Sequence, residues 1–354
     1  MQPSVHSLSG PSAPGRRLLF IAIAALLGVL LSCVAAEVLL RLAGRQPWRR
    51  LSGKENEPTM HEPDPRLGWK PMPGEHVIAP YFPGGPTIHL TFLPDGTRRT
   101  GDATTRPANG QPHDKVAFVG GSTTQGWAID DDETFAWRLQ QQFGALDMVN
   151  YGVTAYGTYQ TLLLMEQVFA APDPPRMVFY GFDEEHEARN VGDLKWLLPL
   201  ALIEKGNIIS TPYCTLGDNG ALIRHAPATY PRFPLREYSA LITFLQERYA
   251  NATGGYRSGQ ARAVTEQLLI EMQRLAAEHG SRFCVVLLHW SPESKTHYVE
   301  FLSQHNIDFV DCAFPLTGDT RVHGDHHANG PMNARYAECI APKLRAAGHT
   351  DGGG

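Results

Sequence analysis

The feature that most constrains the fold is an alternation of short apolar runs and amphipathic stretches that begins after residue 114. Five of the runs are apolar on both faces, as the central strands of a parallel sheet are. These five runs are residues 115–119, 148–151, 176–180, 283–288 and 307–310. Helical patterns cover residues 133–143, 158–169, 260–279 and 332–346. Such βαβ construction predicts a flavodoxin-like three-layer α/β/α sandwich with a five-stranded parallel sheet.

Local signals set the ends of two of these helices. Asp131 precedes residues 133–143 and is expected to cap that helix. Gly280 follows residues 260–279 and is expected to end that helix in a left-handed conformation.

An uncharged apolar segment lies near the N-terminus. Residues 18–36 carry no charged side chain and follow Arg16 and Arg17. A helix of that length measures about 28 Å, enough to cross a bilayer. The arginines before the segment predict a cytoplasmic tail (1–17) and a single-pass transmembrane signal anchor (18–40), with the remainder on the extracytoplasmic, periplasmic side. Cleavage after residues 34–36 and lipidation of Cys33 are alternatives that also export the domain.

The remaining chain divides into three parts. Residues 41–113 are rich in Pro, Gly and charge and read as a linker and accessory β region, with one strand at 87–93. Residues 114–348 form the main domain. Residues 184–256 fit its alternation poorly, and we interpret them as an insertion that lies as a lid over the carboxyl edge of the sheet.

Charge and cysteine content exclude some functions. The net charge of -5, with mixed signs, gives no field to hold a polyanion, so no nucleic-acid partner is expected. No Cys-x-x-Cys pair occurs, and Cys284 and Cys312 lie in apolar runs, which favours buried hydrophobes over a disulfide. We expect no structural metal and no cofactor.

A candidate nucleophile follows the first strand. Ser122 lies in Gly120-Gly121-Ser122-Thr123, where the glycines let the chain turn sharply and the following N–H groups can face a developing oxyanion. A plain strand-to-helix turn and a phosphate cradle are the alternatives. A Walker loop is excluded because no Gly-Lys-Ser/Thr follows.

A serine hydroxyl needs a base, and the chain offers one before the last helix. Asp325 and His327 lie in a polar loop that opens on the same sheet edge as Ser122. Asp325 would face Nδ1 of His327, leaving Nε2 for Ser122. The same loop, with His323, His326 and His327 beside Asp325, could instead bind zinc.

Residues 114–344 resemble the SGNH, or GDSL-type, serine hydrolase superfamily. Gly120-Gly121-Ser122-Thr123 is similar to the Gly-Gly-Ser variant of its first block. Asp325-His326-His327-Ala328-Asn329 is similar to its last block, although one residue shorter than the commonest Asp-x-x-His and with Ala for Pro. The resemblance implies Ser122 as nucleophile, Asp325 as orienting carboxylate and His327 as base, with His326 as the fallback. Its second block implies Gly152 as an oxyanion glycine.

The third block departs from the family pattern. Gly181-Phe182-Asp183-Glu184 stands where the family has Gly-x-Asn-Asp, and an ionised Asp183 would repel an oxyanion. Either Asp183 is protonated or has another part, or the donor is His186, Arg189 or Asn190, which share a helix face. A surface helix with ordinary charge pairing is the alternative for these three.

The resemblance implies a carboxylic ester hydrolase. We expect an extracytoplasmic serine esterase that cleaves an acetyl or short O-acyl ester, on a small molecule or a glycan, through an acyl-serine intermediate. An O-acyltransferase for a cell-envelope glycan would use the same residues. A catalytically idle binding domain of the same fold is the third possibility.

Overall fold

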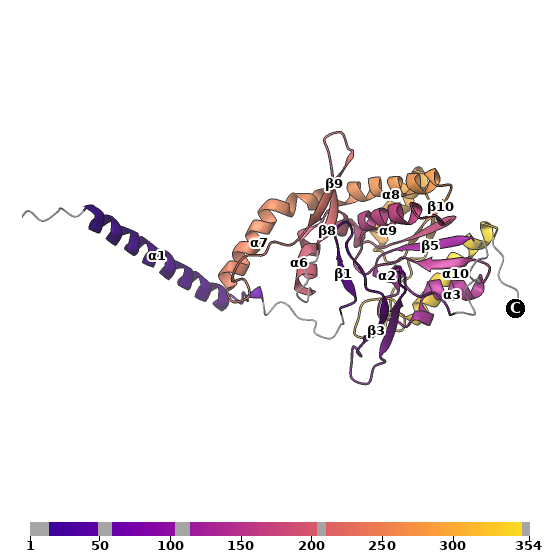
Figure 1. Ribbon diagram of the computed structural model, residues 1–354, viewed down its shortest axis with the longest axis horizontal. Helices are drawn as coiled ribbons and strands as arrows, with labels where there is room; N and C mark the ends of the chain where they lie inside the picture. The colour runs from indigo at the N-terminus through magenta and orange to yellow at the C-terminus, as the bar shows by residue number, and fades with distance from the viewer. Residues whose placement is uncertain (1–13, 49–58, 103–113, 204–209, 349–354) are drawn as a thin grey trace, which may run out of the picture. The chain divides into compact units, whose positions relative to one another are not determined.

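A five-stranded parallel sheet forms the centre of the fold, as predicted. The computed structural model describes residues 14–48, 59–102, 114–203 and 210–348. Its sheet runs in the order β11-β10-β7-β5-β6. Two of these strands, β5 and β10, are labelled in Figure 1. The strands are β5 (Lys115–Gly120), β6 (Asp147–Asn150), β7 (Met177–Phe182), β10 (Arg282–Leu287) and β11 (Asp308–Asp311). Every strand lies within two residues of its predicted bounds.

The strand order creates a switch point beside the candidate nucleophile. In chain order the sheet reads 2-1-3-4-5, the flavodoxin-like arrangement. The connections leave β5 and β7 in opposite directions, so a crevice opens at their carboxyl ends. Ser122 follows β5 and Asp183 follows β7 at this edge.

Helices cover both faces of the sheet, which completes the predicted three layers. Alternate residues of β5 enter different cores: Ala117 and Val119 pack in one, Val116 and Phe118 in the other. The first core is closed by α4 (Thr158–Phe169), α8 (Ala261–Glu278) and α9 (Pro292–Gln304). The second is closed by α3 (Phe135–Gln142) and α10 (Gly330–Ala346).

The predicted cap of α3 is wrong, and the predicted end of α8 is confirmed. A 3-10 turn, η2 (Asp131–Glu133), precedes α3, whose cap is Thr134: its Oγ1 accepts the N–H of Trp137 at 3.2 Å. The Asp131 carboxylate binds Arg98 and the N–H of Thr91 instead. Gly280 follows α8 with a φ of +66°.

The accessory β region holds more regular structure than expected. The predicted strand is confirmed as β4 (Ile88–Phe92), and it pairs antiparallel with β3 (Gly74–Ile78). A second pair, β1 (His61–Asp64) with β2 (Gly68–Pro71), was not predicted. The N–H of Arg98 donates to the carbonyl of Asn150 in β6 at 2.8 Å, so this region is attached to the main sheet.

The segment interpreted as an insertion also contains regular elements. These are α5 (His186–Asn190), α6 (Leu194–Ile203), β8 (Thr211–Leu216), β9 (Leu222–Ala228), α7 (Ala240–Gly254) and η3 (Gly255–Gln260). The chain groups into two compact units, one of residues 1–53 with 231–251 and one of residues 54–230 with 252–354. A lid function for the insertion stays a prediction.

One cysteine expectation is wrong. Cys312 forms a disulfide with Cys339, with Cα atoms 6.0 Å apart. Cys339 lies on α10, which packs over the end of β11, so the two are neighbours in space although 27 residues separate them. Cys284 is a buried free thiol, as expected.

The N-terminal apolar segment is helical. Helix α1 (Pro14–Leu42), at the indigo end of the colour scale in Figure 1, contains a stretch, Arg17–Leu42, that is long and apolar enough to cross a membrane. The most apolar part of that stretch is not buried within the protein.

Candidate active site

Ser122 begins a short helix directly after β5. Gly120 has a φ of +152°, and a Cβ there would lie 2.6 Å from the carbonyl oxygen of Gly181, so only glycine fits this turn. The chain then enters α2 (Ser122–Gln125), whose N-cap residue, Gly121, provides no side-chain hydrogen bond. Ser122 is only 6% exposed. The first N–H groups of α2 have no acceptor within the helix.

The structure brings Ser122, His327 and Asp325 together. His327 Nε2 lies 2.8 Å from Ser122 Oγ, and His327 Nδ1 lies 2.5 Å from Asp325 Oδ1. The same Asp325 oxygen accepts the backbone N–H of His327 at 2.8 Å, which fixes the carboxylate against the imidazole. This is the arrangement in which a carboxylate orients a base and the base takes the proton of a serine.

The other histidines of this loop lie elsewhere. His326 is exposed, and His323 packs edge-on against Phe82 with ring centroids 4.5 Å apart. Among the residues that the structure describes, no group of three or more His, Cys, Asp or Glu side chains could hold a metal ion. The zinc interpretation therefore has no support from the geometry.

Gly152 packs against α2. A Cβ on this residue would lie 2.4 Å from the backbone nitrogen of Gln125. Its N–H donates to Asn150 Oδ1 at 2.9 Å, and the Asn150 amide donates to the Thr124 carbonyl at 2.9 Å. The N–H of Gly152 is thus already hydrogen-bonded, and its role as an oxyanion donor remains a prediction that requires this bond to exchange.

Two of the predicted donors on α5 are engaged in packing contacts. The Asn190 amide donates to Thr158 Oγ1 and Thr265 Oγ1, so it ties α5 to α4 and α8 rather than facing Ser122. Arg189 donates from one terminal nitrogen to the Tyr156 carbonyl at 2.9 Å and pairs through the other with Glu185. All three predicted residues are buried, so α5 is not the surface helix considered as an alternative.

Asp183 and His186 lie beneath the start of α2. His186 Nδ1 is 2.7 Å from the Tyr180 hydroxyl, and its Nε2 lies 2.7 Å from the place of a Cβ on Gly121. The Asp183 carboxyl is hydrogen-bonded to the side chain of Thr123, the neighbour of Ser122. His186 Nε2 and one oxygen of Asp183 are buried without a hydrogen-bond partner.

Burial determines the charge states of Asp183 and His186. It raises the pKa of Asp183, and the opposing effects of Arg189 and of the Thr123 hydrogen bond do not cancel it. Burial, followed by the nearby Arg189 charge, lowers the pKa of His186 well below its ordinary value. His186 is therefore neutral at neutral pH, and Asp183 is ionised less readily than a surface carboxyl.

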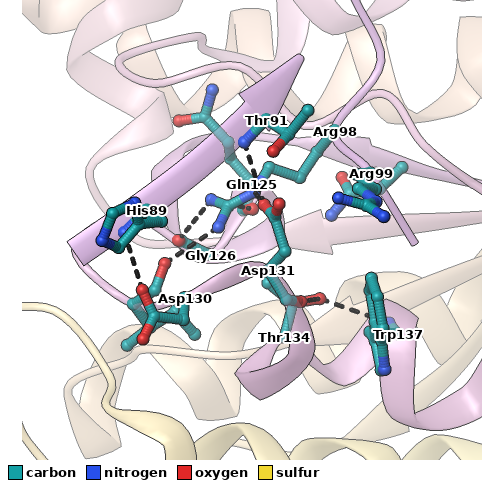
Figure 2. Close-up of polar contacts among 12 residues, drawn as sticks. His89, Thr91, Arg98, Arg99, Gln125, Gly126, Asp130, Asp131, Thr134 and Trp137 are labelled. Atoms are coloured by element: carbon teal, nitrogen blue, oxygen red, sulfur yellow. Dashed lines mark hydrogen bonds and ion pairs between the residues drawn. The ribbon is translucent and has the colours of Figure 1, made fainter. Parts of the chain in front are cut away.

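A buried arginine holds the other end of α2. The Arg98 guanidinium donates to the carbonyls of Gly126 and Ile129, each at 2.8 Å, and to Asp131 Oδ1 at 2.7 Å (Figure 2). Its side chain is fully buried. Arg98 thus fixes the loop that follows α2.

That loop also carries Trp127, which lies beside His327. The ring of Trp127 lies 6.3 Å from that of His327, measured between centroids. The backbone N–H of Trp127 donates to the Ser122 carbonyl at 3.0 Å. Neither Arg98 nor Trp127 was a predicted site residue. Arg98 lies in a segment interpreted as accessory, and no local pattern reveals a contact across 30 residues.

A cavity of about 260 Å³ lies between the accessory strands and the loop after β6. Tyr151, Tyr156, Asp64 and Asp95 are among the residues that line it. Neither Ser122 nor His327 lines it, so we do not place the scissile ester there.

No family model and no curated protein matches the sequence. Solved structures to which the chain is similar include one described as TesA, with 14% identity and a TM-score of 0.38 over 66% of this chain and 98% of that chain. A member of the lipolytic G-D-S-L family from Veillonella parvula has 13% identity and a TM-score of 0.38, over 65% and 98% of the two chains. The esterase EstA from Pseudoalteromonas sp. has 9% identity and a TM-score of 0.38, over 66% and 99%.

Proposed function

We propose that this protein is a membrane-anchored serine esterase of the SGNH type, which cleaves an acetyl or short-acyl ester through an acyl-Ser122 intermediate. The observation that carries the proposal is the hydrogen-bonded row of Asp325, His327 and Ser122, with 2.8 Å between base and nucleophile. An idle binding domain has no need for these three groups in this order.

The reaction begins with proton transfer. His327 Nε2 removes the Ser122 proton as Oγ attacks the acyl carbon, while Asp325 stabilises the imidazolium that forms. The tetrahedral intermediate collapses when His327 donates this proton to the departing alkoxide, which leaves as an alcohol. Water then attacks the acyl-Ser122 with His327 again as base, which releases the acid and regenerates the serine.

The oxyanion donors belong to the start of α2 and its surroundings. We assign the Ser122 N–H as the first donor, because it stands at the uncapped end of the helix. Gly152 is the second, through exchange of its bond to Asn150. Asp183, His186 and Arg189 contact the turn that carries Ser122. Asn190 positions α5.

The location that we propose is a membrane-attached, extracytoplasmic one. The apolar helix α1 supplies the anchor, and the Cys312–Cys339 disulfide is consistent with an oxidising compartment such as the periplasm. This location makes a cell-envelope glycan ester or a small-molecule ester the substrate class.

Labelling with a fluorophosphonate probe tests the nucleophile. We expect wild-type protein to be labelled and Ser122→Ala protein to be unlabelled. His327→Ala should label far more slowly, because the base is lost. Absence of label on folded wild-type protein would overturn the esterase proposal and favour the binding domain.

A second assay separates hydrolysis from transfer. Purified protein is given an acetyl ester in water, with and without a polysaccharide acceptor. Esterase function predicts release of acetate at a rate that the acceptor does not change. Acetate release only at trace levels, with acetyl groups recovered on the polysaccharide, would establish the acyltransferase instead.

A further inference from the structure

The last turns of α1 are bound to the start of α7. The Glu37 carboxylate accepts the N–H groups of Ala240 at 3.0 Å and Leu241 at 2.8 Å, and the Ser239 hydroxyl at 2.8 Å. Arg41 donates to the carbonyl of Tyr238 at 2.8 Å. Glu37 therefore caps α7 from another helix, and its charge is matched by free N–H groups at a helix start.

More contacts extend this attachment beyond the end of α1. The N–H of Trp48 donates to the Arg236 carbonyl at 3.0 Å, and the Arg236 guanidinium lies 4.1 Å over the buried Trp48 ring. Arg45 pairs with Glu247 at 3.2 Å. Residues 231–251 accordingly group with residues 1–53 as one compact unit.

The position of Glu37 along α1 sets the depth of this unit in a bilayer. The uncharged residues 18–36 span about 28 Å, close to the roughly 30 Å of the hydrocarbon core. In a helix that spans, Glu37 therefore stands where hydrocarbon meets the headgroups. The residues hydrogen-bonded to Glu37 and Arg41 stand at the same level.

Large apolar side chains are exposed at that level. Leu235 is 68% exposed and Tyr238 is 67% exposed. Leu245 and Tyr249, farther along α7, are also exposed. Leu235 has a φ of +65°, a conformation that is costly for a bulky residue and that persists where the surrounding structure enforces it. The chain thus holds an apolar side chain outward at an energetic cost.

We propose that residues 231–251 form a juxtamembrane platform that inserts Leu235 and Tyr238 into the headgroup region of the bilayer around the end of α1. This inference rests on the membrane anchor proposed above. Leucine and tyrosine suit that interface, and exposed Leu235 and Tyr238 lie next to the residues that bind the end of α1. Attachment at two points restrains the tilt and rotation of α1.

The test uses the full chain in vesicles of phosphatidylcholine and phosphatidylglycerol. Cys33 is replaced by serine, and single cysteines are introduced as Leu235→Cys or Tyr238→Cys and labelled with an environment-sensitive fluorophore. Asp218→Cys, at the exposed turn between β8 and β9, is the matched control. The parent without an added cysteine measures any reaction of the buried Cys214 and Cys284.

We expect the fluorophore at residues 235 and 238 to emit at shorter wavelength than at 218. Nitroxide-bearing lipids should quench it several-fold more strongly there, and aqueous iodide several-fold more weakly. Equal iodide quenching at 235, 238 and 218 would overturn the platform. A blue shift that depends on the protein-to-lipid ratio, without lipid quenching, would assign the surface to a second copy of the chain and also overturn it.

A separate measurement isolates the anchor. Alkaline carbonate should leave the full chain in the vesicles. Release by carbonate would overturn the proposed anchor itself. Retention together with water-exposed labels at 235 and 238 would overturn the platform alone.

Discussion

Two buried polar clusters hold α2, the helix that begins at Ser122, and they differ in how completely their hydrogen bonds are made. At the end of α2, all three nitrogens of Arg98 donate, to Asp131 and to backbone carbonyls. At its start, Asp183 and His186 each retain a buried atom without a hydrogen-bond partner. We call these the Arg98 cluster and the Asp183 cluster.

The difference indicates separate roles. A buried charge whose bonds are all made contributes to stability and fixes geometry, since its removal leaves its partners unpaired. Buried polar atoms without partners are costly and are found where function requires them. We therefore expect the Arg98 cluster to determine stability and the Asp183 cluster to determine how the site responds to pH and substrate.

The largest effect is expected from Arg98→Ala. This change removes the arginine from Asp131 and leaves the carbonyls of Gly126 and Ile129 without this donor, and the free energy of unfolding should fall by about 3–5 kcal/mol. Urea denaturation measures it. Arg99→Ala is the control, because Arg99 is only partly buried, and its loss should be below about 1 kcal/mol. Equal losses for the two variants would remove the distinction between the clusters.

Gly121→Ala tests the other end of α2 by crowding. The new Cβ would lie 2.7 Å from His186 Nε2, so we expect about 1–3 kcal/mol of destabilisation and a lower kcat, because Ser122 is displaced. Gly144→Ala is the control, because a Cβ at Gly144 meets open space, and it should change stability and kcat very little. Adding His186→Ala to Gly121→Ala should restore part of the loss, and failure to do so would contradict the contact.

Asp183→Asn should change stability in a pH-dependent way. Burial raises the pKa of Asp183 in the folded state. Folding therefore takes up a proton at pH values between the pKa of the unfolded chain and the pKa of the folded protein. The stability that the wild type has in acid is lost as the pH passes the folded pKa. The free energy of unfolding of the variant should therefore rise relative to that of the wild type from acid to neutral pH. Denaturation at several pH values measures this difference. A constant difference would contradict the raised pKa.

Glu184→Gln should give a smaller effect of the opposite sign. Burial acts to raise the pKa of Glu184, but hydrogen bonds from Ser294 and Ser291 outweigh it and lower the pKa. The wild type then has extra stability above the unfolded pKa, and loses it as the pH falls through the folded value. The variant should lose most at neutral pH and converge with the wild type in acid. Parallel pH trends for the two variants would contradict this contrast.

Much of this site was visible in the sequence because it depends on local patterns. The apolar runs predict the five strands. Because the carboxyl ends of parallel strands lie at one edge of the sheet, Ser122 and the Asp325–His327 loop were expected to lie close together. Arg98, the disulfide between Cys312 and Cys339 and the strands β1–β3 were not predicted. Each of these features depends on which segments, distant in sequence, pack together in the fold. A short sequence motif does not predict such packing.

The capping residue of α3 illustrates the same limit. Asp131 has the right type and position for a cap, but the buried Arg98 charge attracts its carboxylate more strongly, and Thr134 takes the capping place. A local propensity was overridden by a contact that only the folded chain makes.

The measurement that tests the account most directly is the trapping of an acyl group on Ser122. Protein mixed with p-nitrophenyl acetate is quenched in acid, and its peptides are analysed by mass spectrometry. We predict acetylation of the peptide that contains Ser122 in the wild type and none at that site in Ser122→Ala or His327→Ala. Ester turnover that continues undiminished in Ser122→Ala, with no acetyl group on Ser122 in the wild type, would contradict the account.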